Sequence, residues 1–171
     1  MRYKTKYFSP IGELTLASDG ENLTGLWINR QKYHGELKYD MEIIDDLEVF
    51  RKAKDYLDRY FSLQKLKRDE VSMLFKGTDF QKQVWKILTE IPYGEVVTYK
   101  DISDIYAKNN NIKSMSPQAI GGAVGKNPIS IIVPCHRVVG LNKSLTGFAG
   151  GIDIKVKLLE IEEVDVSLYI T

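Results

Sequence analysis

One ten-residue stretch constrains this chain more than any other: Ile131–Gly140, with the sequence IIVPCHRVVG. It holds the only cysteine, Cys135, next to His136, which is one of only two histidines. Apolar residues on both sides predict burial, and Pro134 fixes its own φ and favours an extended conformation in the residue before it. We therefore expect Cys135 to be held rigidly at the edge of a packed core. Because a free cysteine is often only apolar filler, the remaining sequence must decide whether this thiol reacts.

The composition limits the possible classes of protein. With 171 residues, 43% hydrophobic and 27% charged, the chain suits one globular domain or two small ones. No apolar run approaches the roughly 20 residues that span a bilayer, and the first residues lack the apolar core of a signal peptide. A single cysteine can form neither an internal disulfide nor a cysteine-rich zinc site. These features predict a cytoplasmic protein with no membrane association.

Charge is distributed unevenly along the chain. The whole sequence has a net charge of +1, but residues 76–151 carry nine basic and five acidic side chains, a net charge of +4. This mildly basic segment contains Cys135. The distribution fits a polyanionic partner such as nucleic acid without requiring one.

The N-terminal part predicts a small α+β unit with a structural role. Runs rich in Tyr, Thr, Leu, Ile and Trp, separated by turn signals, indicate an antiparallel sheet, and an amphipathic helix follows. Asp45 or Asp46 is expected to cap this helix, with Glu48 in capping-box spacing from Asp45. The predicted strands span 2–8, 12–18, 23–29 and about 41–44, the helix spans 46–62, and a charged linker spans 64–70.

Helix signals become sharper after residue 77. A capping box, a Thr with an Asp three residues later, and a Ser-Pro start predict three helices, and a polar loop is expected at 107–115. In the second helix, Ile102 and Ile105 are expected to face inward. A last helix at 152–163 is expected to bury three apolar side chains. The three starts are Thr78 with Gln81, Thr98 with Asp101, and Ser116 before Pro117, and the last helix would bury Ile152, Val156 and Leu159.

The third of these helices, residues 117–125, is unusually slim. It contains Gly121, Gly122 and Gly125, each of which costs up to about 1 kcal/mol relative to alanine in a helix. Small residues allow a close approach by something bulky, and the two short helices together suggest a helix-turn-helix. Tight packing of the slim helix against its own core would explain the glycines equally well. The spacing alone leaves both interpretations open.

Chemistry at Cys135 would require an activated thiol. A thiol with a pKa of about 8.5 is mostly protonated at neutral pH, and only the thiolate is a strong nucleophile. His136 is adjacent in sequence, and neighbouring side chains of an extended segment point to opposite sides. A water-bridged relay, with a distant carboxylate that orients the imidazole, is therefore easier than a direct contact. His34 is expected to be a solvated loop histidine.

Several ordered motifs resemble one family, the O6-alkylguanine-DNA alkyltransferases. The resemblance is dense over residues 78–163, and the N-terminal unit also looks like the family's variable first domain. The motifs begin with PCHRVV at 134–139 around the cysteine. The others are FQKQVW at 80–85, IPYGEVVTY at 91–99, AIGGA at 119–123, NP at 127–128 and GFAGG at 147–151.

The resemblance implies an α+β fold in two domains. Residues 1–70 would form the small antiparallel sheet with its helix. Residues 76–171 would form a mostly helical DNA-binding and alkyltransferase domain with a winged-helix-like helix-turn-helix. The slim helix would then enter the minor groove of DNA.

The resemblance also implies roles for individual residues. Cys135 would be the nucleophile, His136 would relay its proton, and Glu162 would orient the histidine. Tyr99 would assist base extrusion and donate a proton to the leaving base, and Asn127 would brace the turn beneath the site. The residues expected to contact DNA or the base are Lys100, Gln118, Ala119, Gly122, Asn127, Arg137, Val138, Phe148 and Ala149.

The implied function is direct reversal of DNA damage. The alkyl group of O6-alkylguanine, and of O4-alkylthymine, in double-stranded DNA would move once to Cys135, after the base is flipped out of the duplex. No cofactor, metal or obligatory protein partner is expected, and the protein would act as a monomer. The chain departs from the family at Gln118, where arginine is common, at Phe148, where tyrosine is common, and in a longer segment between Tyr99 and Gln118. The cysteine and histidine ligands of the family's zinc-bearing members are missing.

Two other functions compete with this interpretation. A non-enzymatic alkyl-lesion-binding protein of the alkyltransferase-like type would share the fold but lack the nucleophile, and the presence of Cys135 argues against it. A cysteine hydrolase would need a histidine distant in sequence but close in space. His34 has no suitable sequence context for that role.

Overall fold

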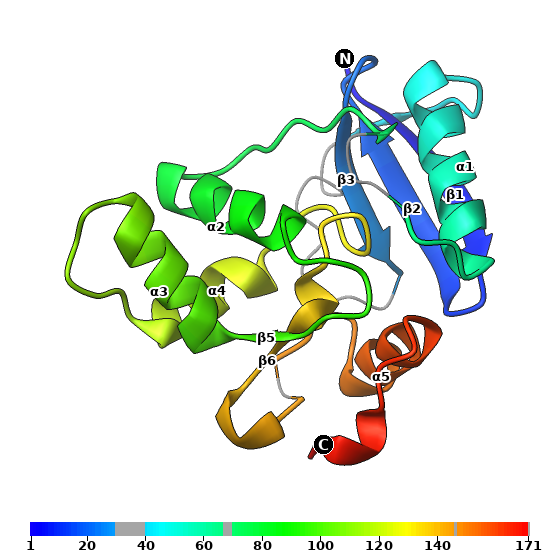
Figure 1. Cartoon of the computed structure of the whole chain (residues 1–171). Coiled ribbons are helices and arrows are strands. Elements are labelled where there is room, and N and C mark those ends of the chain that lie inside the picture. The colour runs from blue at the N-terminus through cyan, green and yellow to red at the C-terminus, as the bar shows by residue number, and fades with distance from the viewer. Residues whose placement is uncertain (30–39, 67–69, 146, 171) are drawn as a thin grey trace. The chain divides into compact units, whose positions relative to one another are not determined.

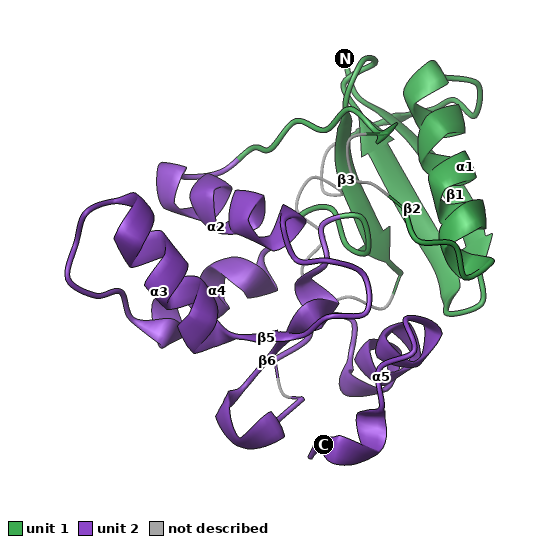
Figure 2. Ribbon diagram, in the orientation of Figure 1, with its two compact units in different colours: residues 1–76, 128–132 green, residues 77–127, 133–171 purple. Residues whose placement is uncertain are grey.

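A computed structural model describes residues 1–29, 40–66, 70–145 and 147–170 (Figure 1). The chain divides into two compact units (Figure 2). Unit 1 is Met1–Lys76 with Pro128–Ile132, and unit 2 is Gly77–Asn127 with Val133–Thr171. Neither unit is continuous in sequence. His34 and part of the predicted linker lie outside the described residues.

Unit 1 contains the predicted sheet. Its strands are β1 (Tyr3–Ser9), β2 (Gly12–Ser18), β3 (Leu23–Ile28) and β4 (Glu42–Ile43), in the order β3-β2-β1-β4. The three long strands pair antiparallel, as expected, and the two-residue β4 pairs parallel to β1. The register places Thr5 opposite Leu16 and Leu16 opposite Leu26, and these three side chains are buried on one face.

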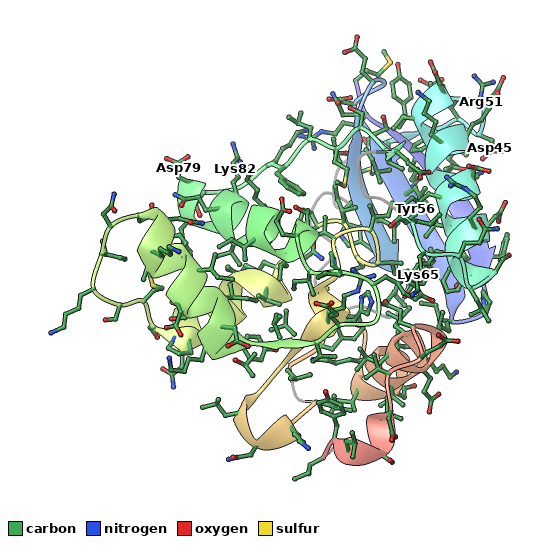
Figure 3. All side chains as sticks on the ribbon, viewed as in Figure 1. Asp45, Arg51, Tyr56, Lys65, Asp79 and Lys82 are labelled. Carbon is green, nitrogen blue, oxygen red and sulfur yellow. The ribbon has the colours of Figure 1, made fainter. Side chains whose placement is uncertain are left out.

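Helix α1 (Glu48–Phe61) forms where expected, but its predicted cap is wrong. Its N-cap is Leu47, which makes no side-chain capping bond. Asp45 instead accepts a hydrogen bond from Thr5 Oγ1 on β1 at 2.5 Å, and Asp46 pairs with Arg51 at 2.7 Å. Asp45 and Arg51 are labelled in Figure 3. Both carboxylates are thus engaged by partners that the local spacing does not reveal.

The segment Pro128–Ile132 extends the sheet of unit 1. Leu26 N donates to Pro128 O at 2.9 Å, and Ser130 N donates to Leu26 O at 3.0 Å. Asn127 and Val133, the unit 2 residues on either side, are joined by a 2.8 Å hydrogen bond from Asn127 Nδ2 to Val133 O. Asn127 is buried, so its amide closes the base of this loop immediately before the Cys135 turn.

Unit 2 is mostly helical. Helices α2 (Asp79–Thr89), α3 (Tyr99–Asn109) and α4 (Pro117–Gly125) pack on one another (Figure 1). The capping box predicted at Thr78 is present, and the helix start predicted at Thr98 is a capping box with Asp101. Helix α5 (Ile152–Ile161) follows later in the chain. A two-stranded parallel sheet pairs β5 (Val97–Thr98) with β6 (Val138–Val139), and short 3₁₀ turns span Cys135–Arg137, Leu141–Lys143 and Val166–Leu168.

Two predictions of buried faces are wrong in part. Ile105 is 43% exposed, because the buried side of α3 carries Ile102 and Tyr106, four residues apart. Ile152 is 36% exposed at the start of α5, and the face beneath it buries Ile154, Leu158 and Leu159. Helix α3 also runs to Asn109, into the stretch predicted as a loop. In the described part of the chain, no helix is both long and apolar enough to cross a membrane.

The structure separates the two interpretations of the slim helix α4. Its buried side packs through Ala123, whose carbonyl accepts a 2.9 Å hydrogen bond from Trp85 Nε1 on α2. A Cβ atom built on Gly122 or Gly125, however, would meet nothing within 4 Å. Packing against its own core therefore does not explain these two glycines. They leave open space on the outer surface of the helix.

Exchanging glycine for alanine should accordingly have opposite effects in α4 and in β3. Gly122→Ala should raise the free energy of unfolding by up to about 1 kcal/mol, because the methyl group meets no obstacle and alanine favours helix. Gly25→Ala should destabilise the protein, because its Cβ would lie 2.0 Å from the Trp27 ring. Urea unfolding of both variants measures this. A loss of stability in Gly122→Ala would contradict the prediction.

Candidate active site

Cys135 begins a 3₁₀ turn, Cys135–Arg137, rather than continuing an extended segment. The turn is set by Cys135 N, which donates to Val133 O at 2.8 Å, and by Arg137 N, which donates to Pro134 O at 3.0 Å. The thiol is buried, with 7% of the residue exposed. The expectation that Cys135 and His136 point to opposite sides of a strand therefore does not apply.

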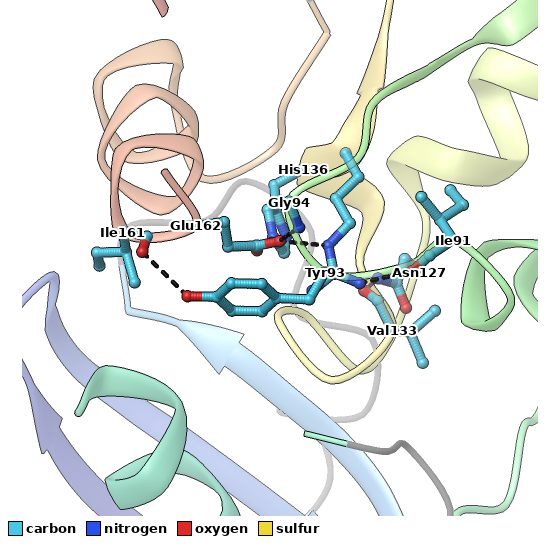
Figure 4. A network of polar contacts seen from close by, with 9 residues as sticks. Ile91, Tyr93, Gly94, Asn127, Val133, His136, Ile161 and Glu162 are labelled. Carbon is cyan, nitrogen blue, oxygen red and sulfur yellow. Dashed lines mark hydrogen bonds and ion pairs between the residues drawn. The ribbon is translucent and has the colours of Figure 1, made fainter. Parts of the chain in front are cut away.

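Glu162 holds a buried polar network around His136 (Figure 4). The carboxylate lies at the C-cap of α5; its Oε2 hydrogen-bonds His136 Nε2, and its Oε1 accepts from Arg137 Nε at 2.6 Å and from Gly94 N at 3.0 Å. Tyr93 OH donates to Ile161 O at 3.0 Å beside it. The His136 and Glu162 side chains are fully buried. The predicted contact of Glu162 with His136 is present.

The surroundings set the charges of this pair. Burial alone would raise the pKa of Glu162, but the hydrogen bond to His136 and the charge of Arg137 lower it to about 2. Burial also lowers the pKa of His136, and outweighs the attraction of Glu162. At neutral pH the network therefore combines an ionised carboxylate, a neutral imidazole and a guanidinium.

The network also assigns the histidine tautomer. Because Nε2 faces a carboxylate that can only accept, Nε2 carries the proton and Nδ1 bears the lone pair. Nδ1 is buried, and among the described residues it has no hydrogen-bond partner. His136 therefore presents a free basic nitrogen inside the site.

Arg137 is buried, so its predicted role as a DNA contact is wrong. It is 8% exposed, and besides its bond to Glu162 it donates from Nη1 to Ile91 O at 2.7 Å. Its guanidinium carbon lies 5.8 Å from the centre of the Tyr93 ring. The arginine thus completes the buried network instead of facing solvent.

Lys155 is a functional candidate that sequence reasoning missed. This α5 residue is fully buried, and its Nζ donates to Val138 O, the main-chain carbonyl next to the Cys135 turn. Burial lowers the pKa of Lys155 to about 8. Burial likewise raises the pKa of Cys135, against the side-chain hydrogen bond of Asn127 and the charge of Lys155. The resting thiol is therefore protonated, and a base must activate it.

A cavity of about 420 Å³ opens in the surface of unit 2 between α3, α4 and the loop that follows β6. Tyr99, the first residue of α3, is half-buried at its wall, and a Cβ on Gly147 would lie 2.9 Å from its hydroxyl. Burial and the charge of Cys135 raise the pKa of Tyr99 to about 12, so its phenol stays protonated. The lining residues are Tyr99, Lys100, Pro117, Gln118, Gly121, Leu141 and Gly147.

Of the remaining predicted contacts, Lys100 and Gln118 line this cavity, and the others lie on α4 or in the turn after Gly147. Gln118, Ala119 and Gly122 are exposed on α4, and Lys100 is exposed and paired with Asp104 at 2.8 Å. Phe148 and Ala149 are partly buried in a turn closed by Gly151 N, which donates to Phe148 O at 3.1 Å. In residues 1–29, 40–66, 70–145 and 147–170, no three His, Cys, Asp or Glu side chains gather as a metal ion would require.

The sequence matches two family models. One is the 6-O-methylguanine DNA methyltransferase DNA binding domain, over residues 79–164, and the other is the ribonuclease-like domain of the same family, over residues 2–69. The chain is 40% identical to a methylated-DNA–protein-cysteine methyltransferase of Haemophilus influenzae, with 95% of this chain and 87% of the relative covered. It is 44% identical to another of Methanosarcina acetivorans, with 94% and 97% covered.

Solved structures agree with this assignment. The fold is similar to Mycobacterium tuberculosis OGT in complex with DNA, with a TM-score of 0.80, 39% identity, and 97% of this chain and 98% of that chain covered. It is also similar to the O6-methylguanine methyltransferase of Mycobacterium tuberculosis, with a TM-score of 0.80, 42% identity, and 95% and 93% covered. Both domains, the buried cysteine network and these relatives lead to one assignment: the chain belongs to the 6-O-methylguanine DNA methyltransferase family.

Proposed function

We propose that this protein repairs DNA by taking the alkyl group of O6-alkylguanine onto Cys135. The observation that carries the proposal is the buried Cys135 turn. There the thiol is followed in sequence by a neutral histidine, whose Nε2 is hydrogen-bonded to Glu162. The relatives are named for the same transfer, from methylated DNA to a protein cysteine. The structural relative in complex with DNA supports a DNA partner.

The transfer begins with the thiol proton. His136 Nδ1 accepts it through a bridging water, and Glu162 stabilises the resulting imidazolium. The thiolate sulfur attacks the alkyl carbon, the new S–C bond forms, and the C–O6 bond breaks. Its electron pair moves into the guanine ring. Lys155 places positive charge near the developing thiolate and fixes the Val138 carbonyl.

Tyr99 supplies the proton that the leaving base requires, and the proton that His136 took from the thiol then returns to the Tyr99 phenolate through solvent. Its phenol is at the cavity wall and stays protonated at neutral pH, since its pKa is about 12. The product at Cys135 is a thioether, and the sequence offers no second cysteine to resolve it. Each molecule therefore acts once, and the alkyl donor is the lesion itself.

Helix α4 forms the proposed DNA contact. Its outer surface carries Gln118, Ala119 and Gly122, all exposed, and Gly122 leaves open space around its Cα. A smooth, small-residue surface suits the narrow minor groove, and Gln118 at the cavity wall can fill the gap that a flipped nucleotide leaves in the stack.

The finer properties of the protein are also proposed here. We infer that it selects alkylated bases, O4-alkylthymine included, acts as a monomer, and works in the cytoplasm. A reducing compartment favours this function, because the lone thiol must stay unoxidised to react. The competing lesion-binding function would require no transfer at all, and the intact nucleophile with its base speaks against it.

Replacing the nucleophile tests the proposal most directly. After mixing with a duplex that contains O6-methylguanine, the intact mass of the wild-type protein should rise by one methyl group. Cys135→Ser should gain nothing, because a serine hydroxyl is a far weaker nucleophile, yet it should bind the duplex with nearly wild-type affinity. A wild-type protein that binds the lesion tightly at unchanged mass would support the lesion-binding alternative.

The pH dependence of transfer should reveal the role of Arg137. The charge of Arg137 disfavours the imidazolium, so Arg137→Gln should raise the pKa of His136. The acid limb of the single-turnover rate profile should then move to higher pH. Arg137→Lys keeps the charge and serves as the control, with its acid limb near that of the wild type. If the acid limb stays in place in a folded Arg137→Gln protein, Arg137 does not set the pKa of His136.

Gln118 should act as a wedge with little electrostatic help. Gln118→Arg should tighten duplex binding and steepen log K against log salt by about 0.9 for one added phosphate contact. Gln118→Ala should slow base extrusion and hence transfer. Gln64→Arg is the control, because it makes the same charge change at an exposed residue of unit 1. If Gln118→Ala matches the wild type in affinity and rate, the 110–115 loop becomes the next candidate.

A further inference from the structure

A short segment late in the chain is joined by backbone hydrogen bonds to the loop that lines the cavity. We call residues Asp165–Ile170 the strap and residues 140–145 the pocket loop. Leu145 N donates to Ile170 O at 2.9 Å, and Ile170 N donates to Lys143 O at 2.7 Å. Ser144 and Ile170 form a parallel bridge between the two segments.

The pocket loop has a backbone conformation that is unusual for non-glycine residues. Asn142 and Lys143 have φ values of 59° and 61°, so two successive non-glycine residues lie in the left-handed region. Such residues persist only where the surroundings fix them. Among the described restraints are an internal bond, from Gly140 N to Ser144 O at 2.7 Å, and the strap's two hydrogen bonds.

Side-chain packing holds the strap in place. Val166 and Tyr169 of the strap pack against a buried cluster formed by Val139, Leu145 and Leu159. This cluster joins β6, the pocket loop and α5. By contrast, Leu168 is 57% exposed and the Ile170 side chain is 66% exposed. Ile170 therefore acts through its backbone, whereas Val166 and Tyr169 act through their side chains.

The pocket loop forms one wall of the cavity. Leu141 lines it directly, and the loop leads to Gly147, which lies against the Tyr99 hydroxyl. A shift of the loop would thus move both the wall and the neighbourhood of the phenol. The opposite wall, made by α3 and α4, has no hydrogen bond to the strap in the described bonds.

We infer that the strap positions the pocket loop for alkyl transfer, and that it limits the size of the alkyl group the cavity admits. The inference rests on the proposed function. The strap touches neither Cys135 nor the outer surface of α4 through any described hydrogen bond, so it acts on the wall and not on the nucleophile or the DNA contact. It is a positioning element of the site.

One residue permits a matched test. Ile170→Pro removes the N–H that bonds Lys143 O, and the extended Tyr169, with φ −112° and ψ 153°, accepts a following proline. Ile170→Ala removes only an exposed side chain and keeps both backbone bonds. Val166→Ala and Leu168→Ala form a second pair, one packed and one exposed.

Single-turnover rates on duplexes with O6-methylguanine or O6-benzylguanine give the readout. Ile170→Pro should transfer methyl about tenfold more slowly, since small displacements in a site carry large rate penalties. Its benzyl-to-methyl rate ratio should rise, because the wall yields. Affinity for unmodified duplex should stay unchanged, and amide exchange at Leu145 should accelerate. Ile170→Ala should match the wild type throughout.

The outcomes separate this inference from the proposed function. If Ile170→Pro and Ile170→Ala have the same transfer rates and the same benzyl-to-methyl ratios, the inference about the strap is wrong, while the proposed transfer still stands. A uniform slowing that follows thermal stability, with the ratio unchanged, would overturn it too, because that is the effect of lost stability alone. A wild-type protein that transfers no alkyl group would overturn the proposed function, and Leu145 exchange would still test the strap.

Discussion

The buried carboxylate of Glu162 is the interaction on which the active site depends. An isolated carboxylate in the protein interior is costly, and it is retained only with partners for both oxygens. Here His136, Arg137 and the Gly94 amide supply them. These partners come from the Cys135 turn and from the loop after α2, and Glu162 itself caps α5. One charge therefore fixes three segments and sets the imidazole orientation.

The same network accounts for a nucleophile that is inactive at rest. Burial keeps the Cys135 thiol protonated, while the neutral His136 offers a basic nitrogen at Nδ1. Reactivity of a cysteine follows its thiolate character and exposure. A buried thiol is thus protected from oxidants until a substrate occupies the site and the proton moves. For a protein whose only cysteine is used once, this protection preserves its single turnover.

The sequence predicts local features of this structure well and distant ones poorly. The capping boxes at Thr78 and Thr98 depend on residues three apart, so spacing was sufficient. The cap expected from Asp45 failed because Thr5, forty residues away, engages that carboxylate. Only the family resemblance points to Glu162, because it lies 26 positions from His136 in the sequence. Nothing in the sequence indicates that Arg137 and Lys155 are buried, because charged residues are normally exposed.

The glycines of helix α4 are explained by function and not by stability. Glycine weakens a helix, and at Gly122 and Gly125 the structure has room for a side chain. Natural sequences retain such weaknesses where activity needs them. A methyl group at these positions would cost the free protein nothing, yet it would thicken the surface proposed to enter the minor groove. The glycines are therefore best explained by the DNA partner, and Gly25, which the Trp27 ring covers, is explained by the fold alone.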